Sequence, residues 1–142
     1  MSTYDIDAVN VAGLAEVAKF YETVGYGDGV SQADTTLAIR LDGRLLGAVR
    51  LCTEGGVIVL RGMQVATDFR GKGMGHALLT HCVPYLEKNT AYCLPYEHLT
   101  RFYGRVGFVL APPGLLPKFL AERLAGYVSM NRKTVAMCRM PQ

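Results

Sequence analysis

Three glycines alternate with a lysine and a methionine in one short stretch, and this spacing suits the binding of a phosphate group. Residues 68–75 read Asp-Phe-Arg-Gly-Lys-Gly-Met-Gly. Glycine tolerates a positive φ and lets backbone N–H groups approach an anion, because it has no side chain in the way. The first N–H groups of a following helix are also free and carry a partial positive charge. We therefore predict an anion site here, with Arg70 and Lys72 at its rim.

This stretch joins a predicted strand to a predicted helix. Residues 57–65 read Val-Ile-Val-Leu-Arg-Gly-Met-Gln-Val, which is typical of a strand. After the glycines, apolar residues recur on one helical face to about residue 88, and Pro84 is expected to kink this helix. The nucleoside-triphosphate loop is excluded, because no lysine with the required glycines precedes a serine or threonine. The dinucleotide loop is excluded too, because His76 and Leu78 stand where its last glycine would fall.

A third pattern fits. Residues 70–75, Arg-Gly-Lys-Gly-Met-Gly, resemble the R/Q-x-x-G-x-G/A motif of the GNAT superfamily, the acetyl-CoA-dependent N-acetyltransferases. Residues 102–108, Phe-Tyr-Gly-Arg-Val-Gly-Phe, resemble the later F-Y-x-x-x-G-F segment of that family. The resemblance spans at least residues 14–110, and a strand near 133–140 would complete it. It implies an α/β (α+β) fold with a mixed, mostly antiparallel central sheet of about six to seven strands flanked by helices.

The resemblance also implies how acetyl-CoA, the co-substrate, is held. The pyrophosphate would contact the backbone at 71, 73 and 75, within a site formed by Arg70, Gly71, Lys72, Gly73, Met74, Gly75 and His76. Met63, Gln64 and Val65 match the strand residues that hold the pantetheine arm. The N–H of Met63 would face the thioester carbonyl, and the backbone of Val65 would pair with pantetheine. The alternative is a tight turn and an ordinary core strand without a ligand.

Tyr103 matches the family's tyrosine beside the CoA sulfur, where it acts as general acid. A phenol with its usual pKa near 10 is protonated at neutral pH and can donate to a thiolate. The alternative is a core aromatic residue beside Phe102.

The general base departs from the family pattern. Val59 stands where some relatives carry a glutamate, and no strand carboxylate replaces it. His98 is one candidate, because an imidazole titrates near neutral pH. His76 and His81 are weaker candidates, because both lie on the helix after the glycine stretch. Deprotonation through water, or binding of an already neutral amine, are the alternatives.

A second departure concerns Tyr96, which stands where many relatives carry an asparagine that contacts the pantetheine arm. That contact is therefore replaced or lost, and the segment around Tyr96 and His98 could form a wall of the substrate site.

The remaining sequence predicts the elements of one domain over residues 1–142. We expect further strands at 4–11, 35–41, 45–51, 90–94, 107–110 and 135–140, and further helices at 13–25, 97–105 and 115–124. Asp42-Gly43 predicts a hairpin turn, and strand 90–94 is expected to pair in parallel with strand 57–65. The insertion 111–132 would shape the pocket or a dimer interface.

The amino-acid composition and charge narrow the classes of protein to which this chain can belong. Half of the 142 residues are hydrophobic and 19% are charged, which is typical of a globular protein. No apolar run reaches the ~18 residues of a membrane span, and the polar, acidic start is unlike a signal peptide, so we expect a cytoplasmic protein. The net charge of +3 suits an anionic co-substrate, but no basic tract predicts nucleic-acid binding.

The four cysteines are expected to be buried free thiols with no metal or disulfide role, because they are scattered in apolar surroundings without a Cys-x-x-Cys pair. Only Cys93 is a minor candidate for a covalent acetyl relay.

Two functions from different classes follow. The first is an acetyl-CoA-dependent N-acetyltransferase that transfers the acetyl group directly to an amine of a small molecule or a peptide. The second is a non-catalytic CoA-binding module with a regulatory or interaction role. The resemblance allows a homodimer through edge strands, because relatives often dimerise in this way, but the sequence does not fix the oligomeric state.

Overall fold

The first half of the chain forms an antiparallel meander of four strands. These are β1 (Tyr4–Ala8), β2 (Thr35–Leu41), β3 (Arg44–Glu54) and β4 (Val57–Val65). Asp42 and Gly43 both have a positive φ, 50° and 84°, so they form the predicted two-residue turn between β2 and β3. The structure, a computed structural model, describes residues 4–142.

Three short strands complete the sheet, which has the order β1-β2-β3-β4-β5-β7-β6. They are β5 (Ala91–Cys93), β6 (Val109–Leu110) and β7 (Met137–Arg139). β5 is parallel to β4, as predicted, and the other pairings are antiparallel. The crossover from β4 to β5 is the helix α2 (Met74–Leu86). The fold class expected from the sequence is therefore confirmed.

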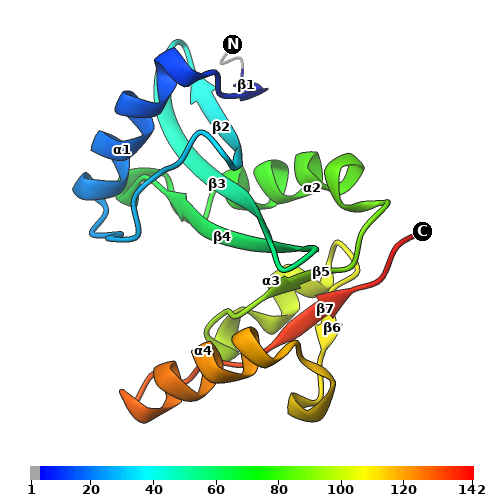
Figure 1. Ribbon diagram of the computed structural model, residues 1–142. Helices are drawn as coiled ribbons and strands as arrows, with labels where there is room; N and C mark the ends of the chain where they lie inside the picture. Colours follow the sequence, from blue (N-terminus) through cyan, green and yellow to red (C-terminus); the bar gives the residue numbers. More distant parts are fainter. Residues whose placement is uncertain (1–3) are drawn as a thin grey trace.

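Helices cover both faces of the first half of the sheet. α1 (Leu14–Thr23) and α2 lie on opposite sides of it (Figure 1). The central residues of β2, from Thr36 to Ile39, are all buried, because helices cover both faces. One core cluster joins α1 residues such as Val17 with α2 residues such as Leu78 through the strands.

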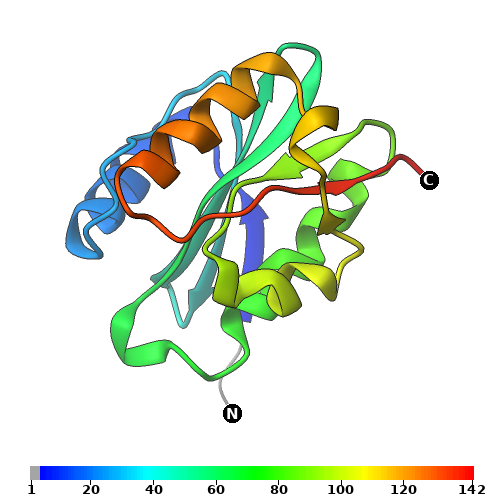
Figure 2. The same ribbon diagram turned by 90° about the horizontal axis from the view of Figure 1, so that it is seen from below.

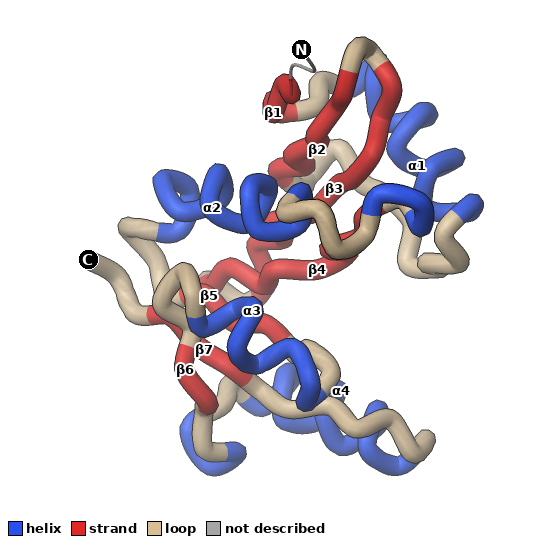
Figure 3. Tube along the Cα trace, turned by 180° about the vertical axis from the view of Figure 1, so that it is seen from behind, coloured by secondary structure: helices blue, strands red, loops and turns tan. Residues whose placement is uncertain are grey.

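The second half of the fold lies below β4 (Figure 1) and shares the main core through Ala91, Tyr103 and Met137. It comprises α3 (Thr100–Gly104), α4 (Lys118–Ser129) and strands β5 to β7 (Figures 1 and 3). A small core cluster of Val59, Leu116, Leu120 and Ala136 lies under α4. Four short 3-10 turns connect the elements: Val11–Gly13, Thr67–Phe69, Glu97–Leu99 and Pro113–Leu115.

Two of the boundaries that differ from the prediction have local reasons. β1 ends at Ala8, because the Asn10 side chain accepts a hydrogen bond from the Gly13 N–H at 3.0 Å and caps a 3-10 turn. The predicted helix 115–124 begins only at Lys118, directly after Pro117, and extends to Ser129. A proline has no N–H to donate and fits the start of a helix. α2 continues through Pro84 to Leu86.

Candidate active site

β4 and β5 pair over a very short distance, and this creates a gap in the sheet. The only paired residues are Ile58 with Ala91 and Val59 with Tyr92. From Leu60 to Val65, β4 has no partner strand on the β5 side within the described residues 4–142. Its backbone polar groups on this edge need other partners, so an extended ligand can bind there as a strand would.

A bulge lies in the middle of this open edge. Arg61 pairs with Arg50 and Gln64 pairs with Ala48, so β4 has one residue more than β3 between these pairs. Gly62 has φ +66°, and a Cβ there would lie 2.7 Å from the Tyr21 hydroxyl oxygen. The Tyr21 hydroxyl donates to the Gly62 carbonyl at 2.9 Å. This buried tyrosine of α1 therefore fixes the peptide groups around Gly62 and Met63.

A cavity of about 390 Å³ opens at this point between the two halves of the sheet. Its lining includes Met63 and Gln64 of β4, the end of β5, Tyr103 of α3, and residues of the α1–β2 loop and of α4. The structure thus brings together three of the site residues predicted from the sequence: Met63, Gln64 and Tyr103. Val65 and residues 70–76 lie outside the lining of this cavity.

The glycine stretch has the backbone geometry that an anion site needs. Gly71 and Gly73 have φ +78° and +84°, and a Cβ at either position would meet no atom within 4 Å. Gly73 is the N-cap of α2, so the free N–H groups of that helix start here. The residues therefore fit a pyrophosphate, because the backbone is uncovered and the space in front of it is open.

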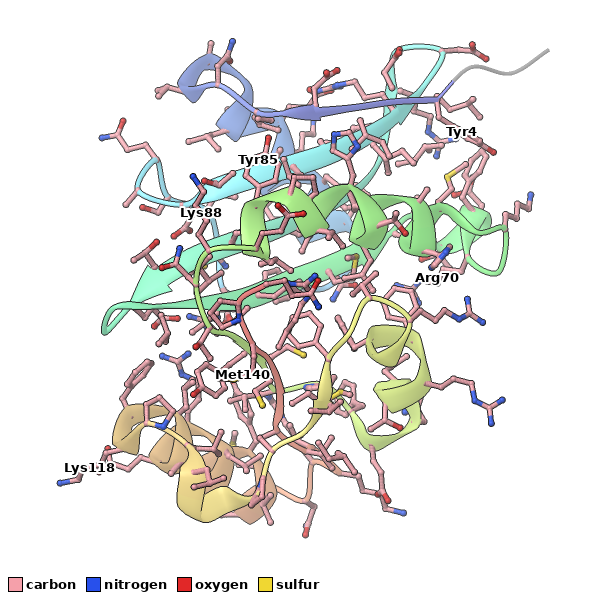
Figure 4. The ribbon with its side chains drawn as sticks, turned by 90° about the vertical axis from the view of Figure 1, so that its right-hand side faces the viewer. Tyr4, Arg70, Tyr85, Lys88, Lys118 and Met140 are labelled. Carbon is pink, nitrogen blue, oxygen red and sulfur yellow. The ribbon has the colours of Figure 1, made fainter. Side chains whose placement is uncertain are left out.

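The side chains of this stretch have different roles. Met74 is buried in the core, so only its backbone faces the anion site. The Arg70 Nε donates to the Val65 carbonyl at 3.1 Å and ties the stretch to the end of β4, at the N-terminal end of α2 (Figure 4). The Lys72 ammonium lies 5.1 Å from the ring centre of Phe69. Both cations remain exposed, as the rim of a phosphate site requires.

Gly75 connects the glycine stretch to the cavity. A Cβ at Gly75 would lie 3.4 Å from the Phe102 ring and 3.6 Å from Val65, so α2, α3 and β4 meet here. Phe102 in turn packs edge-on against Tyr103 at 4.9 Å between ring centres. A ligand that lies on the glycine stretch can therefore extend along β4 to Tyr103.

Tyr103 is buried, with 6% of its surface exposed, and still borders the cavity. Its ring also packs against Phe108, as the alternative of a core aromatic residue implies, and the role of general acid stays a prediction. Its hydroxyl has no hydrogen-bond partner among residues 4–142. Burial raises its pKa well above the usual value, so the hydroxyl holds its proton at neutral pH.

None of the three histidines, His76, His81 and His98, lines the cavity. His98 is exposed, and its ring stacks on Tyr96 at 5.9 Å rather than lining the cavity. His76 and His81 are exposed on α2. Tyr96 itself does line the cavity, and its part in a substrate wall stays a prediction.

Cys93 lines the cavity but is poorly suited to a covalent relay. Its thiol is buried, and burial raises its pKa far above the usual value, so little thiolate forms at neutral pH. Burial likewise raises the pKa of Cys82 to about 12 and that of Cys52 to about 11. All four cysteines are free thiols, and Cys138 is the one that is only half-buried.

The α1–β2 loop closes one side of the cavity with Gly25, Tyr26, Gly27 and Asp28. A nearly buried ion pair holds it, because Arg50 of β3 donates to Asp34 at 3.1 and 3.2 Å and to the Tyr26 hydroxyl at 3.1 Å. Burial raises the pKa of Tyr26 to about 12. Burial opposes ionisation of Asp28, but the Arg61 cation and hydrogen bonds from Tyr26 and Arg61 lower its pKa overall.

A second ionic network attaches α4 to the sheet. Arg123 of α4 makes two hydrogen bonds to Glu54 at 2.8 and 3.2 Å, and Arg61 approaches the same carboxylate at 3.9 Å. Arg61 also pairs with Asp28 of the loop. The insertion expected to shape the pocket therefore forms one of its walls.

The sequence reasoning did not identify Arg50 or Arg123 as part of this site. Gly62 carried a usable signal, because a glycine inside a strand often marks a bulge. The others lie far from the motifs in sequence, and only the fold brings them together.

Residues 32–110, more than half of the chain, match the family described as Acetyltransferase (GNAT) domain. The chain therefore belongs to the GNAT acetyltransferases. The family expected from the sequence is therefore confirmed. No curated protein matches the chain in sequence.

Solved structures share the fold. A GNAT-family acetyltransferase of Streptococcus pneumoniae superimposes with a TM-score of 0.72 at 15% identity, covering 99% of this chain and 100% of that one. The ribosomal-protein-S18-alanine N-acetyltransferase of Escherichia coli gives 0.70 at 14% identity, covering 99% and 96%.

N-acetylglutamate synthase of Neisseria gonorrhoeae, complexed with coenzyme A and N-acetyl-glutamate, gives a TM-score of 0.67 at 18% identity. The superposition covers 99% of this chain, which spans only 35% of that longer protein. At these identities the likeness establishes the fold. None of the helices between Tyr4 and Gln142 is long and apolar enough to cross a bilayer.

Proposed function

We propose that this GNAT acetyltransferase moves the acetyl group directly to the amine of a small molecule held in the cavity between β4 and β5. The observation that carries the proposal is the open edge of β4 beyond Val59, with the glycine stretch at its end and Tyr103 beside it. The cavity volume of about 390 Å³ is near the lower end of the ~300–1,000 Å³ found for small-molecule sites, which favours a small acceptor.

Two protein groups assist the transfer in this proposal. Acetyl-CoA, when bound, supplies the acetyl thioester. The Met63 N–H, oriented by the bulge at Gly62, is the hydrogen-bond donor for the carbonyl oxygen. Tyr103, protonated and without another hydrogen-bond partner, is the proton donor for the departing thiolate.

No general base is assigned among the histidines, because His98 does not line the cavity. Asp28 is the carboxylate in the lining, but its lowered pKa makes it a weak base. We propose that the amine loses its proton to water, which the open cavity admits.

Calorimetric titration with acetyl-CoA, desulfo-CoA and ATP tests co-substrate binding, and release of free thiol in the presence of amines tests transfer. We expect acetyl-CoA to bind much more tightly than ATP, and amines to stimulate thiol release. Binding without any amine-dependent release would favour the non-catalytic module instead. No binding of any of the three ligands would refute the assignment of the glycine stretch. The cytoplasmic location and the homodimer stay predictions from the sequence.

A further inference from the structure

The charged residues around the cavity do not balance. Asp28 in the cavity lining and Glu54 outside it supply two negative charges, and both are already engaged by Arg61 and Arg123. A third arginine, Arg132, also lines the cavity. Among residues 4–142, Arg132 has no carboxylate partner. One positive charge at the cavity is therefore unmatched by the protein.

The position of Arg132 is set by the end of α4. Asn131 has φ +60°, and its N–H donates to the Val128 carbonyl at 3.0 Å, while the Arg132 N–H donates to the Tyr127 carbonyl at 3.1 Å. These two bonds form a Schellman motif, which reverses the chain after a helix. The reversal places the Arg132 guanidinium 5.2 Å from the ring centre of Tyr127, another residue of the lining.

The segment after Arg132 is fixed as well. The Lys133 carbonyl accepts from the Glu97 N–H at 2.7 Å, and Thr134 forms a bridge with Tyr96. Figure 2 shows this segment running back from α4 toward β7 alongside the chain that follows β5. The backbone around Arg132 is thus anchored on both sides, and its exposed side chain lies against the Tyr127 ring.

We propose that the acceptor is a small amine that also carries a carboxylate, and that Arg132 binds this carboxylate. A guanidinium matches a carboxylate with two parallel hydrogen bonds, and stacking on an aromatic ring leaves its N–H edge available. The protein offers no carboxylate to this arginine, so the ligand supplies it. The inference rests on the proposed acetyl transfer, and it names the class of acceptor.

The test compares matched acceptors in the thiol-release assay with saturating acetyl-CoA. The acceptors are α-, β- and γ-amino acids, each beside its own carboxamide, which keeps the amine and removes the charge. For the best acceptor pair, the acid should have a KM about 10- to 100-fold below that of the amide, which corresponds to one charged hydrogen-bonded pair.

Arg132→Gln should remove this difference by raising KM for the acid, with little change in kcat and in KM for the amide. Arg132→Lys should restore part of the preference, because it keeps the charge but not the paired geometry. Lys118→Gln is the matched control. It removes one charge from the exposed start of the same helix, where the side chain points away from the protein (Figure 4), and the preference should survive.

Equal use of acids and amides, or a preference that survives in Arg132→Gln, would overturn the inference and leave acetyl transfer intact. If acetyl-CoA binds but no acceptor is used, calorimetry of the same acids and amides with the CoA-loaded protein decides. Binding of the acids that depends on Arg132 would support the inference, and its absence would overturn it. If acetyl-CoA itself does not bind, the proposed function fails. Titration of the acids and amides into the protein without CoA then tests the inference by itself. Binding of the acids that depends on Arg132 would support it, and its absence would overturn it.

Discussion

Replacing Tyr21 with phenylalanine tests whether the bulge in β4 orients the catalytic backbone. Tyr21 is 1% exposed, and its hydroxyl donates to the Gly62 carbonyl at 2.9 Å. Burial raises the pKa of this hydroxyl, so it remains a donor across the neutral range. Tyr21→Phe keeps the ring and its packing against Tyr26, at 4.6 Å between centres, and removes one oxygen.

The expected loss of stability is modest. One neutral hydrogen bond contributes about 1 kcal/mol, and a buried carbonyl left without a partner would cost more, up to about 3 kcal/mol. Gly62 lines the cavity, so water can replace the lost donor and keep the cost near the lower figure. For a domain of this size, about 1 kcal/mol lowers Tm by roughly 3–5 °C.

The expected effect on catalysis is larger than the effect on the fold. Complete loss of one oxyanion donor costs about 10²–10³ in kcat. Tyr21→Phe leaves the Met63 N–H in place but loosens the peptide before it, so we expect kcat to fall about tenfold while the affinity for acetyl-CoA stays within about twofold.

Urea unfolding and steady-state thiol release measure the two effects on one preparation. Tyr85→Phe is the control, because Tyr85 is exposed on α2 (Figure 4) and its hydroxyl has no hydrogen-bond partner in the described residues. It should change neither quantity. A loss of stability with kcat unchanged would refute the role of the bulge in orienting Met63, and unchanged stability would show that the hydrogen bond contributes nothing.

Three further predictions concern the co-substrate site and the ionic network. Tyr103→Phe should lower kcat at least tenfold and leave acetyl-CoA affinity nearly unchanged by calorimetry; loss of the fold by circular dichroism would instead assign Tyr103 to the core alone. Gly73→Val should abolish acetyl-CoA binding, because its side chain enters the open phosphate space. Gly56→Val is the control for this variant. Gly56 lies in the β3–β4 turn with φ +81°, so a valine there imposes a similar backbone strain, but the protein should still bind acetyl-CoA. A hydrogen bond from Arg123 lowers the pKa of Glu54 in the folded state, against the opposing effect of burial. The stability from Glu54 is therefore present above its ordinary pKa of 4.5 and is lost as pH falls through the lower folded value. Glu54→Gln should accordingly be less stable than the wild type near neutral pH and show a flatter loss of stability in acid, as measured by urea unfolding over pH. Equal acid slopes would contradict the ion pair.

Local patterns determined most of the secondary structure and the backbone conformation of the glycine stretch. β2 and β4 begin and end where the sequence predicted, because alternating apolar residues and the Asp42-Gly43 turn are local signals. The glycines at 71 and 73 have the positive φ that their spacing suggested, since that requirement comes from the backbone of the turn itself.

The tertiary structure alone decided which distant residues line the cavity beside β4. The cavity opens because the pairing of β4 with β5 ends after Val59. Where this pairing ends depends on how the two halves of the sheet pack against each other. Arg132, Arg61 and Asp28 come from three distant segments, and their neighbours decide which charge is left without a partner. His98 shows the converse, because its type suggested a base while its place on an exposed turn directs it away from the cavity. A sequence motif specifies the backbone geometry of a short turn, whereas charge balance in a cavity depends on contacts across the whole fold.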